Sequence, residues 1–407
     1  MAPSPAAVTD GSKTWSPSHL CSAEGHNADL WSKIHSHLNS NEFKSAIVTA
    51  FELPPGDNFT YHASASVNLS QAEAAIHAGR ANGLHAWYME HKSNDIEAAP
   101  FEDASDQHGL EHRADQASLK LSGYPPASDI QAYLSLFDPT KSAANSLKSL
   151  LANAKKGSIR QSIAEYLLSK RYLDPLIAVP KFKIQSLKND ESQAPILGHE
   201  NPALDFWAYA CLALEYAGPN ENTSLVKSSH HVLPIFMHHF GCVVPSYEAL
   251  HIISKVANGK SVIDMGSGNG YWTLMLRQIG LTVAAVDSVQ SKWRTVWIPD
   301  TTVTDGIQYL RKRGGCPDMV LLLVYPIVGG DFTRKAIESY TGHVICVAGT
   351  QNGNGYTGFK DMMIDEFMRK EKASWKKCAQ VPLPSFAGKD DALFVFRRKK
   401  DADLGSP

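Results

Sequence analysis

The pattern of apolar and polar positions changes near residue 260. Before that point, apolar residues recur at helical spacing after capping residues, most clearly in the series Ile130, Tyr133, Leu134 and Phe137. After it, short runs rich in β-branched residues alternate with helical patterns. This alternation predicts βαβ units and a parallel sheet covered by helices on both faces.

The first part of the chain is predicted to be a largely α-helical region of unknown role, residues 29–240. Helices are predicted over 30–38, 71–88, 130–137, 159–167, 202–217 and 232–240, and a further helix over 247–256 lies at the start of the next region. The helix after Asn201-Pro202 is apolar on nearly every side and is therefore expected to be buried. Residues 1–28, rich in Pro, Ser and Ala, are predicted to be a disordered lead-in, and 94–118 to form a loop.

The second part, residues 241–400, carries the α/β pattern and is followed by a tail at 401–407. Strands are predicted at 261–265, 282–286, 302–304, 319–324, 343–347 and 392–397, with helices at 271–279, 305–312, 332–340 and 360–370.

Composition narrows the class of protein. The 407 residues include 39 Lys and Arg against 41 Asp and Glu, so the formal charge is 39 − 41 = −2, and nucleic-acid binding by bulk electrostatics is not expected. No apolar run approaches the ~18 residues that a membrane helix needs, and the N-terminus lacks a secretory pattern. Six scattered cysteines without a C-x-x-C pair indicate reduced thiols. These features predict a cytoplasmic protein, with a nuclear address at residues 397–400 as a weaker interpretation.

The most informative stretch joins the first predicted strand of the α/β part to its helix. The strand 262–265 runs into a loop containing Gly266, Gly268 and Gly270, and a helix begins at Tyr271. Glycines permit a tight turn and a close approach of the backbone to a ligand, and a helix start offers free N–H groups. The second strand ends in Asp287, where a carboxylate can accept hydrogen bonds from both hydroxyls of a ribose.

Two ligand classes suit this arrangement. A dinucleotide site favours G-x-G-x-x-G, but this loop reads G-x-G-x-G, and Tyr271 stands where the third glycine would fall. The loop, with Asp264 two places before its first glycine, resembles motif I of the class I S-adenosylmethionine-dependent methyltransferases. The resemblance covers about residues 245–398. It implies S-adenosyl-L-methionine as cofactor and a mostly parallel seven-stranded sheet, with the strand at 391–396 inserted antiparallel at its edge.

The resemblance also implies which residues contact the cofactor. The loop would contribute Asp264, Gly266, Ser267, Gly268 and Gly270. Asp287 with Ser288 would hold the ribose, and Asp305 with Gly306 would lie at the adenine. Asp305 is equally a typical helix N-cap, and the two roles are compatible.

The methyl acceptor is less well defined. Methyl transfer needs a base only when the acceptor must lose a proton. The segment Val324-Tyr325-Pro326-Ile327 lacks the [Asp/Asn]-Pro-Pro-[Tyr/Phe] signature of base-amine and glutamine methylation, and Asp331 is the nearest carboxylate after it, so no metal is expected. We therefore expect a small-molecule or protein acceptor.

Two candidate catalytic residues follow. Tyr325 is predicted to face the reaction space, where it would orient the acceptor or contact the sulfonium methyl; the alternative is a strand-end tyrosine with its hydroxyl in solvent. His238 is a candidate for acceptor binding or base catalysis, against the more common role of a packing histidine. At the level of the whole protein, a catalytically silent cofactor-binding scaffold and an NAD(P)-dependent oxidoreductase remain as alternatives.

Overall fold

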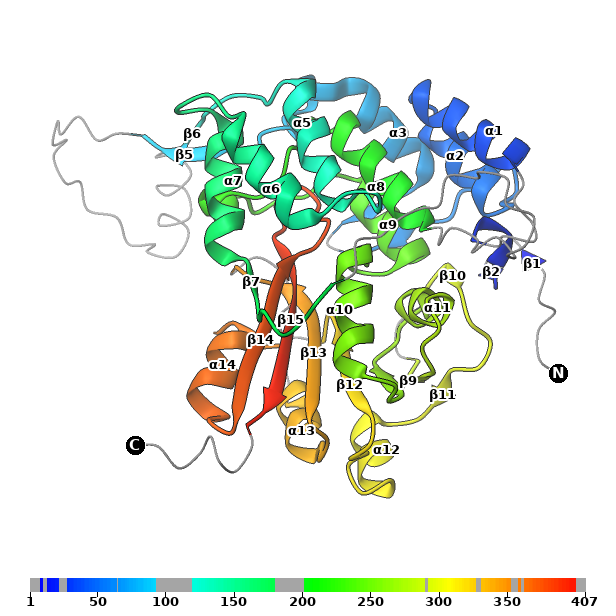
Figure 1. Ribbon diagram of the computed structural model, residues 1–407. Coiled ribbons are helices and arrows are strands. Elements are labelled where there is room, and N and C mark those ends of the chain that lie inside the picture. The colour runs from blue at the N-terminus through cyan, green and yellow to red at the C-terminus, as the bar shows by residue number, and fades with distance from the viewer. Residues whose placement is uncertain are drawn as a thin grey trace, which may run out of the picture.

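A helical region lies over one end of an eight-stranded sheet (Figure 1). The computed structural model describes residues 8–9, 13–21, 28–63, 65–92, 119–179, 201–289, 292–326, 331–352, 358–359 and 362–399. The predicted loop at 94–118 and the tail at 401–407 lie outside the described residues. Within the described part, no helix is both long enough and apolar enough to cross a bilayer.

The sheet has the strand order β11-β9-β8-β12-β13-β15-β14-β7. Its strands are β7 (Tyr172–Leu173), β8 (Val262–Met265), β9 (Val283–Asp287), β11 (Thr302–Val303), β12 (Val320–Val324), β13 (Val344–Thr350), β14 (Trp375–Pro382) and β15 (Asp391–Arg398). The first five strands in this order are mutually parallel. Strand β15 runs antiparallel to both of its neighbours, and β7 runs antiparallel to β14.

The prediction of seven strands is wrong by one strand. The extra strand, β7, comes from the helical region and pairs with β14 through Ala379 and Gln380. The antiparallel direction of β15 is as expected, but the strand lies inside the sheet, because β14 pairs along its outer side. The sequence pattern does not mark β14, since Lys376, Lys377 and Gln380 interrupt its apolar residues.

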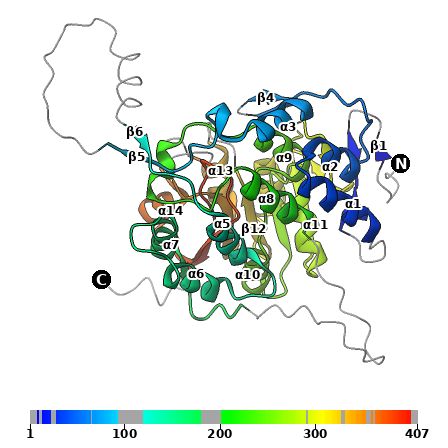
Figure 2. The same cartoon turned by 90° about the horizontal axis from the view of Figure 1, so that it is seen from above.

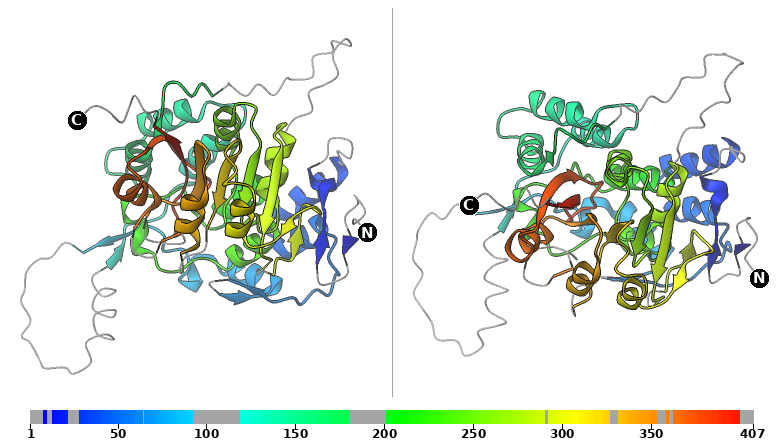
Figure 3. Two further views of the ribbon diagram at one scale, coloured as in Figure 1. Left: turned by 90° about the horizontal axis from the view of Figure 1, so that it is seen from below. Right: turned by 60° about the horizontal axis from the view of Figure 1, so that its bottom comes forward.

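The two faces of the sheet pack against separate helical layers, as the α/β pattern predicts (Figure 3). Alternate residues of β12 face opposite layers, because strand side chains alternate in direction: Leu322 packs with the first core and Leu323 with the second. The first layer contains α10 (Tyr247–Ala257) and α11 (Tyr271–Gln278). The second contains α12 (Gly306–Lys312), α13 (Phe332–Ser339) and α14 (Ile364–Glu371).

The helical region shares the first of these cores. Its helices are α1 (Ala28–Asn39), α2 (Phe43–Ala50), α3 (Leu69–Ala78), α5 (Ala127–Leu134), α6 (Ala143–Ala152), α7 (Ile159–Lys170), α8 (Pro202–Ala213) and α9 (Val232–Phe240). Helix α8 lies near the middle of the region (Figure 2), and its Phe206 and Trp207 are almost fully buried, as its apolar sequence predicts. A single core therefore continues from α8 to one face of the sheet.

Three sequence expectations differ from the structure in this region. The helix predicted over 202–217 ends at Ala213, and Glu215 shortly after it has a positive φ of 54°. The helix predicted over 71–88 ends at Ala78, because Gly79 adopts a positive φ of 53° and a 3₁₀ turn follows over Gly79–Asn82. The lead-in prediction does not hold for residues 13–21. There, β2 (Thr14–Trp15) pairs in parallel with β10 (Thr295–Val296), and Thr14 Oγ1 donates a hydrogen bond to the Phe51 carbonyl at 3.0 Å.

Candidate functional site

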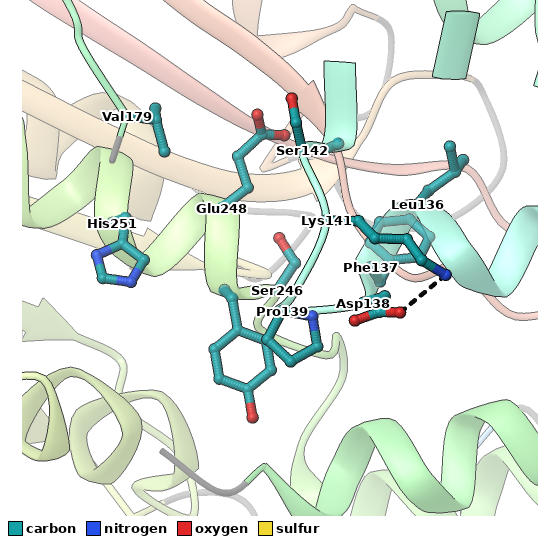
Figure 4. A pocket seen from close by; sticks show the side chains of 12 residues that line it. Leu136, Phe137, Asp138, Pro139, Lys141, Ser142, Val179, Ser246, Glu248 and His251 are labelled. Atoms are coloured by element: carbon teal, nitrogen blue, oxygen red, sulfur yellow. Dashed lines mark ion pairs between the residues drawn. The ribbon is translucent and has the colours of Figure 1, made fainter. Parts of the chain in front are cut away.

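A cavity of about 1430 Å³ lies at the carboxyl ends of β8, β9 and β12, close to the start of α12. Ligands of open α/β sheets bind at this edge. Eight of the predicted site residues line it: His238, Gly266, Gly268, Asp287, Ser288, Asp305, Gly306 and Tyr325. A second cavity, of about 80 Å³, lies beside the start of α10, where Asp138 forms an ion pair with Lys141 (Figure 4). None of the predicted site residues lines this smaller cavity.

The glycine loop turns tightly between β8 and α11. The N–H groups of Gly266 and Ser267 both donate to the Val286 carbonyl, at 2.7 Å and 3.1 Å, which joins the loop to the end of β9. Gly266 and Gly268 have φ values of 78° and 58°, a region that favours glycine. A Cβ added at Gly266 would meet no atom within 4 Å, so the backbone here is open to a ligand.

Asp287 ends β9 beside this loop. One of its carboxylate oxygens accepts from the Gly268 N–H at 2.9 Å, and the other accepts from the Val289 N–H at 2.5 Å. A carboxylate has about four acceptor sites, so each oxygen keeps capacity for one more donor. The carboxylate is thus oriented by the backbone and still able to accept two hydroxyl groups, which meets the requirement for binding a ribose.

Asp305 and Gly306 form the start of α12 at the cavity. Asp305 is the N-cap, and its Oδ1 accepts from the Gln308 N–H at 2.8 Å. Its exposed carboxylate also borders the cavity, so capping and ligand contact are compatible in this geometry. A residue with a side chain does not fit at position 306 without a shift of its neighbours, because an added Cβ would overlap the sulfur of Met265.

Three predicted residues lie behind the cavity wall instead of lining it. Asp264 is fully buried and accepts from the Thr273 hydroxyl at 2.7 Å, and burial raises the pKa of its carboxyl to about 6. Gly270 occupies the N-cap position of α11, where Ile298 leaves no space for a side chain. Ser267 is also buried. In this structure these residues shape the loop and do not contact the cavity.

Tyr325 lines the cavity and has an unusual backbone conformation. It has a positive φ of 48°, which is strained for a residue other than glycine. Its hydroxyl donates to Asp391 Oδ1 at 2.8 Å and accepts from Lys389 Nζ at 3.1 Å, so the alternative of a hydroxyl in solvent is wrong. Burial raises the pKa of Tyr325 well above its ordinary value. The tyrosine is therefore a neutral, fixed part of the wall.

His238 also lines the cavity, on α9, and is 8% exposed. Its Nε2 lies 3.0 Å from the carbonyl oxygen of His62, so Nε2 carries the proton of the neutral ring. Its Nδ1 is buried and has no partner among the described residues. Burial is the main cause that lowers the pKa of His238, and the charge of Arg294 adds to this effect, so the ring is neutral near pH 7.

The structure adds cavity residues that the sequence patterns do not reveal. Phe59, Thr60 and His62 come from the helical region, and no local motif connects them with the glycine loop. Trp293 also lines the cavity, and its ring lies so close to the loop that a Cβ at Gly268 would be 3.3 Å from it. The position of Trp293 shortly after Asp287 is the one feature of the sequence that could have identified it as a cavity residue.

A buried ion pair fixes in place the segment of the helical region that contains Phe59, Thr60 and His62. Arg294 Nη2 donates to Asp57 Oδ1 at 2.6 Å, with the two side chains 0% and 4% exposed. The guanidinium also lies over the ring of Phe59, 4.2 Å from its centroid. Since Arg294 follows Trp293, this contact joins the helical region to the cavity wall.

Comparisons with known proteins identify only remote similarity. No protein-family model and no curated protein matches this chain. One similar solved structure is Burkholderia thailandensis 1,6-didemethyltoxoflavin-N1-methyltransferase with bound 1,6-didemethyltoxoflavin and S-adenosylhomocysteine; the match has 14% identity and a TM-score of 0.28, and covers 38% of this chain and 78% of that one. Another is a SAM-dependent methyltransferase from Agrobacterium tumefaciens, with 8% identity, a TM-score of 0.25, and 37% and 61% coverage. At these scores neither similarity assigns an activity or a substrate to this chain.

Within the described residues, no group of three or more His, Cys, Asp or Glu side chains is arranged to hold a metal ion.

Proposed function

We propose that the protein is an S-adenosyl-L-methionine-dependent methyltransferase. The observation that carries the proposal is the meeting of six predicted cofactor residues at one cavity: Gly266, Gly268, Asp287, Ser288, Asp305 and Gly306. They come from the ends of β8 and β9 and from the start of α12. Open α/β sheets bind nucleotides in the crevice at the carboxyl ends of their strands.

The residues present fit this cofactor. The open backbone at Gly266 suits the close approach of a ligand, the two carboxylate oxygens of Asp287 suit the ribose hydroxyls, and Asp305 suits an amino group of adenine. When bound, the cofactor would supply a methyl carbon on a sulfonium: the acceptor's nucleophile would form the new bond to that carbon, and the electron pair of the broken carbon–sulfur bond would stay with the departing sulfur. The protein's part is to position the nucleophile and to exclude water.

The covering of the cavity favours a small-molecule acceptor. Phe59, Thr60, His62 and Ala63 of the helical region, with Met237 and His238 of α9, supply part of the cavity wall. A cavity of about 1430 Å³ exceeds the ~300–1,000 Å³ of a typical small-molecule site, so it has volume for a cofactor and a second small molecule together.

Calorimetry with S-adenosylhomocysteine, S-adenosylmethionine and NAD tests the proposal. We expect binding of the first two and no binding of NAD. Binding of NAD instead would favour an oxidoreductase. A second assay uses labelled S-adenosylmethionine and a cell extract, where transfer of label to a product is expected. Cofactor binding with no transfer would instead indicate a silent scaffold.

A further inference from the structure

The N-terminal segment that contains β2 contributes a cation to the cavity. Lys13 lines the cavity, although it lies far from the α/β part in sequence. The next residue, Thr14, is fully buried, and its N–H donates to the Arg294 carbonyl at 2.9 Å. The N–H of Ser16 donates to the Val296 carbonyl at 2.6 Å. These two hydrogen bonds hold Lys13 at the cavity.

The side chain of Lys13 lies on the less buried face of β2. Strand side chains alternate in direction, so Lys13 and Trp15 share the face opposite Thr14. In agreement, Lys13 Nζ lies 5.0 Å from the centroid of the Trp15 ring. A cation over an aromatic ring is attracted to it, so this contact restricts the position of the ammonium group.

A second cation lines the cavity close to Lys13. Lys292 is exposed and precedes Arg294 by two residues. The hydrogen bond from Thr14 to Arg294 therefore brings the two lysines close together, because they lie one and two residues from its ends. Arg294 itself is fully buried and paired with Asp57, so its charge is already balanced within the protein.

The charges of the cavity balance only when its ligands are included. Apart from two histidines, the charged side chains of the described lining are Lys13, Lys292, Asp287 and Asp305. S-adenosylmethionine adds a sulfonium, an ammonium and a carboxylate, which sum to one positive charge. The two aspartates are proposed to face uncharged hydroxyl and amino groups of this cofactor. An acceptor with one negative charge would therefore neutralise the filled cavity, where charges attract more strongly than in bulk water.

Aromatic side chains adjoin the two lysines. Trp293 follows Lys292 directly and lines the cavity. Phe59, another lining residue, has its ring centroid 4.2 Å from the guanidinium of Arg294, the residue after Trp293. Rings in a cavity wall favour a ligand with a flat apolar body.

We propose that the methyl acceptor is a small aromatic molecule bearing a carboxylate, which pairs with Lys13 and Lys292 while the ring packs against Phe59 and Trp293. This proposal rests on the proposed methyltransferase function and adds the chemical class of the acceptor. The carboxylate serves for recognition, since lysine ammonium groups donate charge-assisted hydrogen bonds to it. Lys13 and Lys292 are thus specificity residues.

The test uses 2-naphthoate and its uncharged analogue of similar shape, 2-naphthamide, as probes, with S-adenosylhomocysteine bound. We expect calorimetry to show that 2-naphthoate binds about tenfold more tightly, because hydrogen bonds to charged groups are stronger than those between neutral groups. This preference is expected to decrease between ionic strengths of about 0.1 M and 1 M, where the screening length falls from about 10 Å to about 3 Å.

Four variants localise the effect. Lys13→Gln and Lys292→Gln are each expected to reduce the preference for 2-naphthoate at least about threefold, because one charge is lost. Lys13→Arg keeps the charge and is expected to keep the preference, which a merely structural role of Lys13 would not explain. The matched control is Lys312→Gln, since Lys312 is exposed at the end of α12 and does not line the cavity.

The carboxylate of the cofactor's amino-acid part has the same chemistry as that of the acceptor. Binding of S-adenosylhomocysteine is therefore compared with binding of 5′-methylthioadenosine, which lacks the amino-acid part. We expect Lys13→Gln and Lys292→Gln to leave both affinities within about twofold. A loss for S-adenosylhomocysteine alone would assign the lysines to the cofactor and overturn the acceptor proposal.

The remaining outcomes separate the two proposals. With S-adenosylhomocysteine bound, three results would overturn the acceptor proposal while leaving the proposed function intact. They are equal affinity for both probes, no binding of either probe, and a preference that survives both Lys13→Gln and Lys292→Gln. An equal loss in Lys312→Gln would overturn the assignment to these two lysines. Failure of S-adenosylhomocysteine itself to bind would overturn the proposed function, and the acceptor proposal with it.

Discussion

The backbone N–H of Gly268 donates to the carboxylate of Asp287 at 2.9 Å, across 19 positions of sequence. This bond joins the loop after β8 to the end of β9, and both residues line the same cavity. The glycine loop and the acid are therefore one structural unit, in which the loop orients the carboxylate and the carboxylate helps to fix the loop.

Replacement of Asp287 by Ala is expected to weaken binding of S-adenosylhomocysteine by about 1–3 kcal/mol, because charge-assisted hydrogen bonds to the ribose are lost. Calorimetry measures the change, with circular dichroism to confirm the fold. Asp300→Asn serves as control, since Asp300 is more than half exposed and pairs with Arg277 away from the cavity. Unchanged affinity in Asp287→Ala would remove Asp287 from the site.

Replacement of Gly306 by Ala is expected to destabilise the protein by about 1–3 kcal/mol, because the added methyl group would overlap the Met265 sulfur in a packed region. Urea denaturation gives the free energy of unfolding. In the control Gly56→Ala, no atom lies within 4 Å of the new Cβ, so we expect a change of at most about 0.5 kcal/mol. Equal stability of the two variants would contradict the packing at Gly306.

Replacement of Asp57 by Asn is expected to cost about 3–5 kcal/mol of stability, because it removes the counter-charge of a buried guanidinium. The exposed pair between Lys120 and Glu90 provides the comparison, and Glu90→Gln should change the stability far less than Asp57→Asn does, because solvent screens this pair. Chemical denaturation of both variants is the measurement. A small effect of Asp57→Asn would mean that the ion pair does not hold residues 57–62 against the cavity wall.

Two buried neighbours, Asp390 and Asp391, predict a dependence of stability on pH. Burial is the main cause that raises their pKa values, to about 7 and about 6 from an ordinary 3.8. The native state thus holds these protons more tightly than the unfolded chain does. Their stabilising contribution is fully present below pH 3.8 and is lost as the pH rises through these pKa values to about 7.

Asp390→Asn removes one of these ionisations. Relative to the original protein, its free energy of unfolding is expected to increase between about pH 4 and 7, by at most about 1.4 kcal/mol per pH unit. Urea denaturation at several pH values gives the difference, and Asp318→Asn, at an exposed position, is the control. A pH-independent difference for Asp390→Asn would contradict the raised pKa.

The α/β half was accessible to sequence reasoning because its signals are local. Strand β8, the turn at Gly266 and the start of α11 follow one another directly, and each is specified by residues that are neighbours in sequence. The resemblance to class I methyltransferases is what assigned Gly268, Asp287 and Asp305 to a common site, and the three residues line one cavity because parallel strands place their carboxyl ends at one edge of the sheet. Strand β14 was not predicted, because its polar residues interrupt the apolar pattern.

The amino-acid sequence by itself determined the glycine loop, its acid and the order of strand and helix, since these depend on backbone conformation and on the spacing of apolar residues. Only the tertiary structure decided what encloses the cavity. The hydrogen bond between His238 and the His62 carbonyl joins residues 176 positions apart in sequence, and that between Tyr61 and His239 joins residues 178 positions apart. The spacing of apolar residues carries no information over such sequence separations. That Nδ1 of His238 has no hydrogen-bond partner among the described residues likewise follows from which atoms surround the ring, and those atoms are brought together by packing alone.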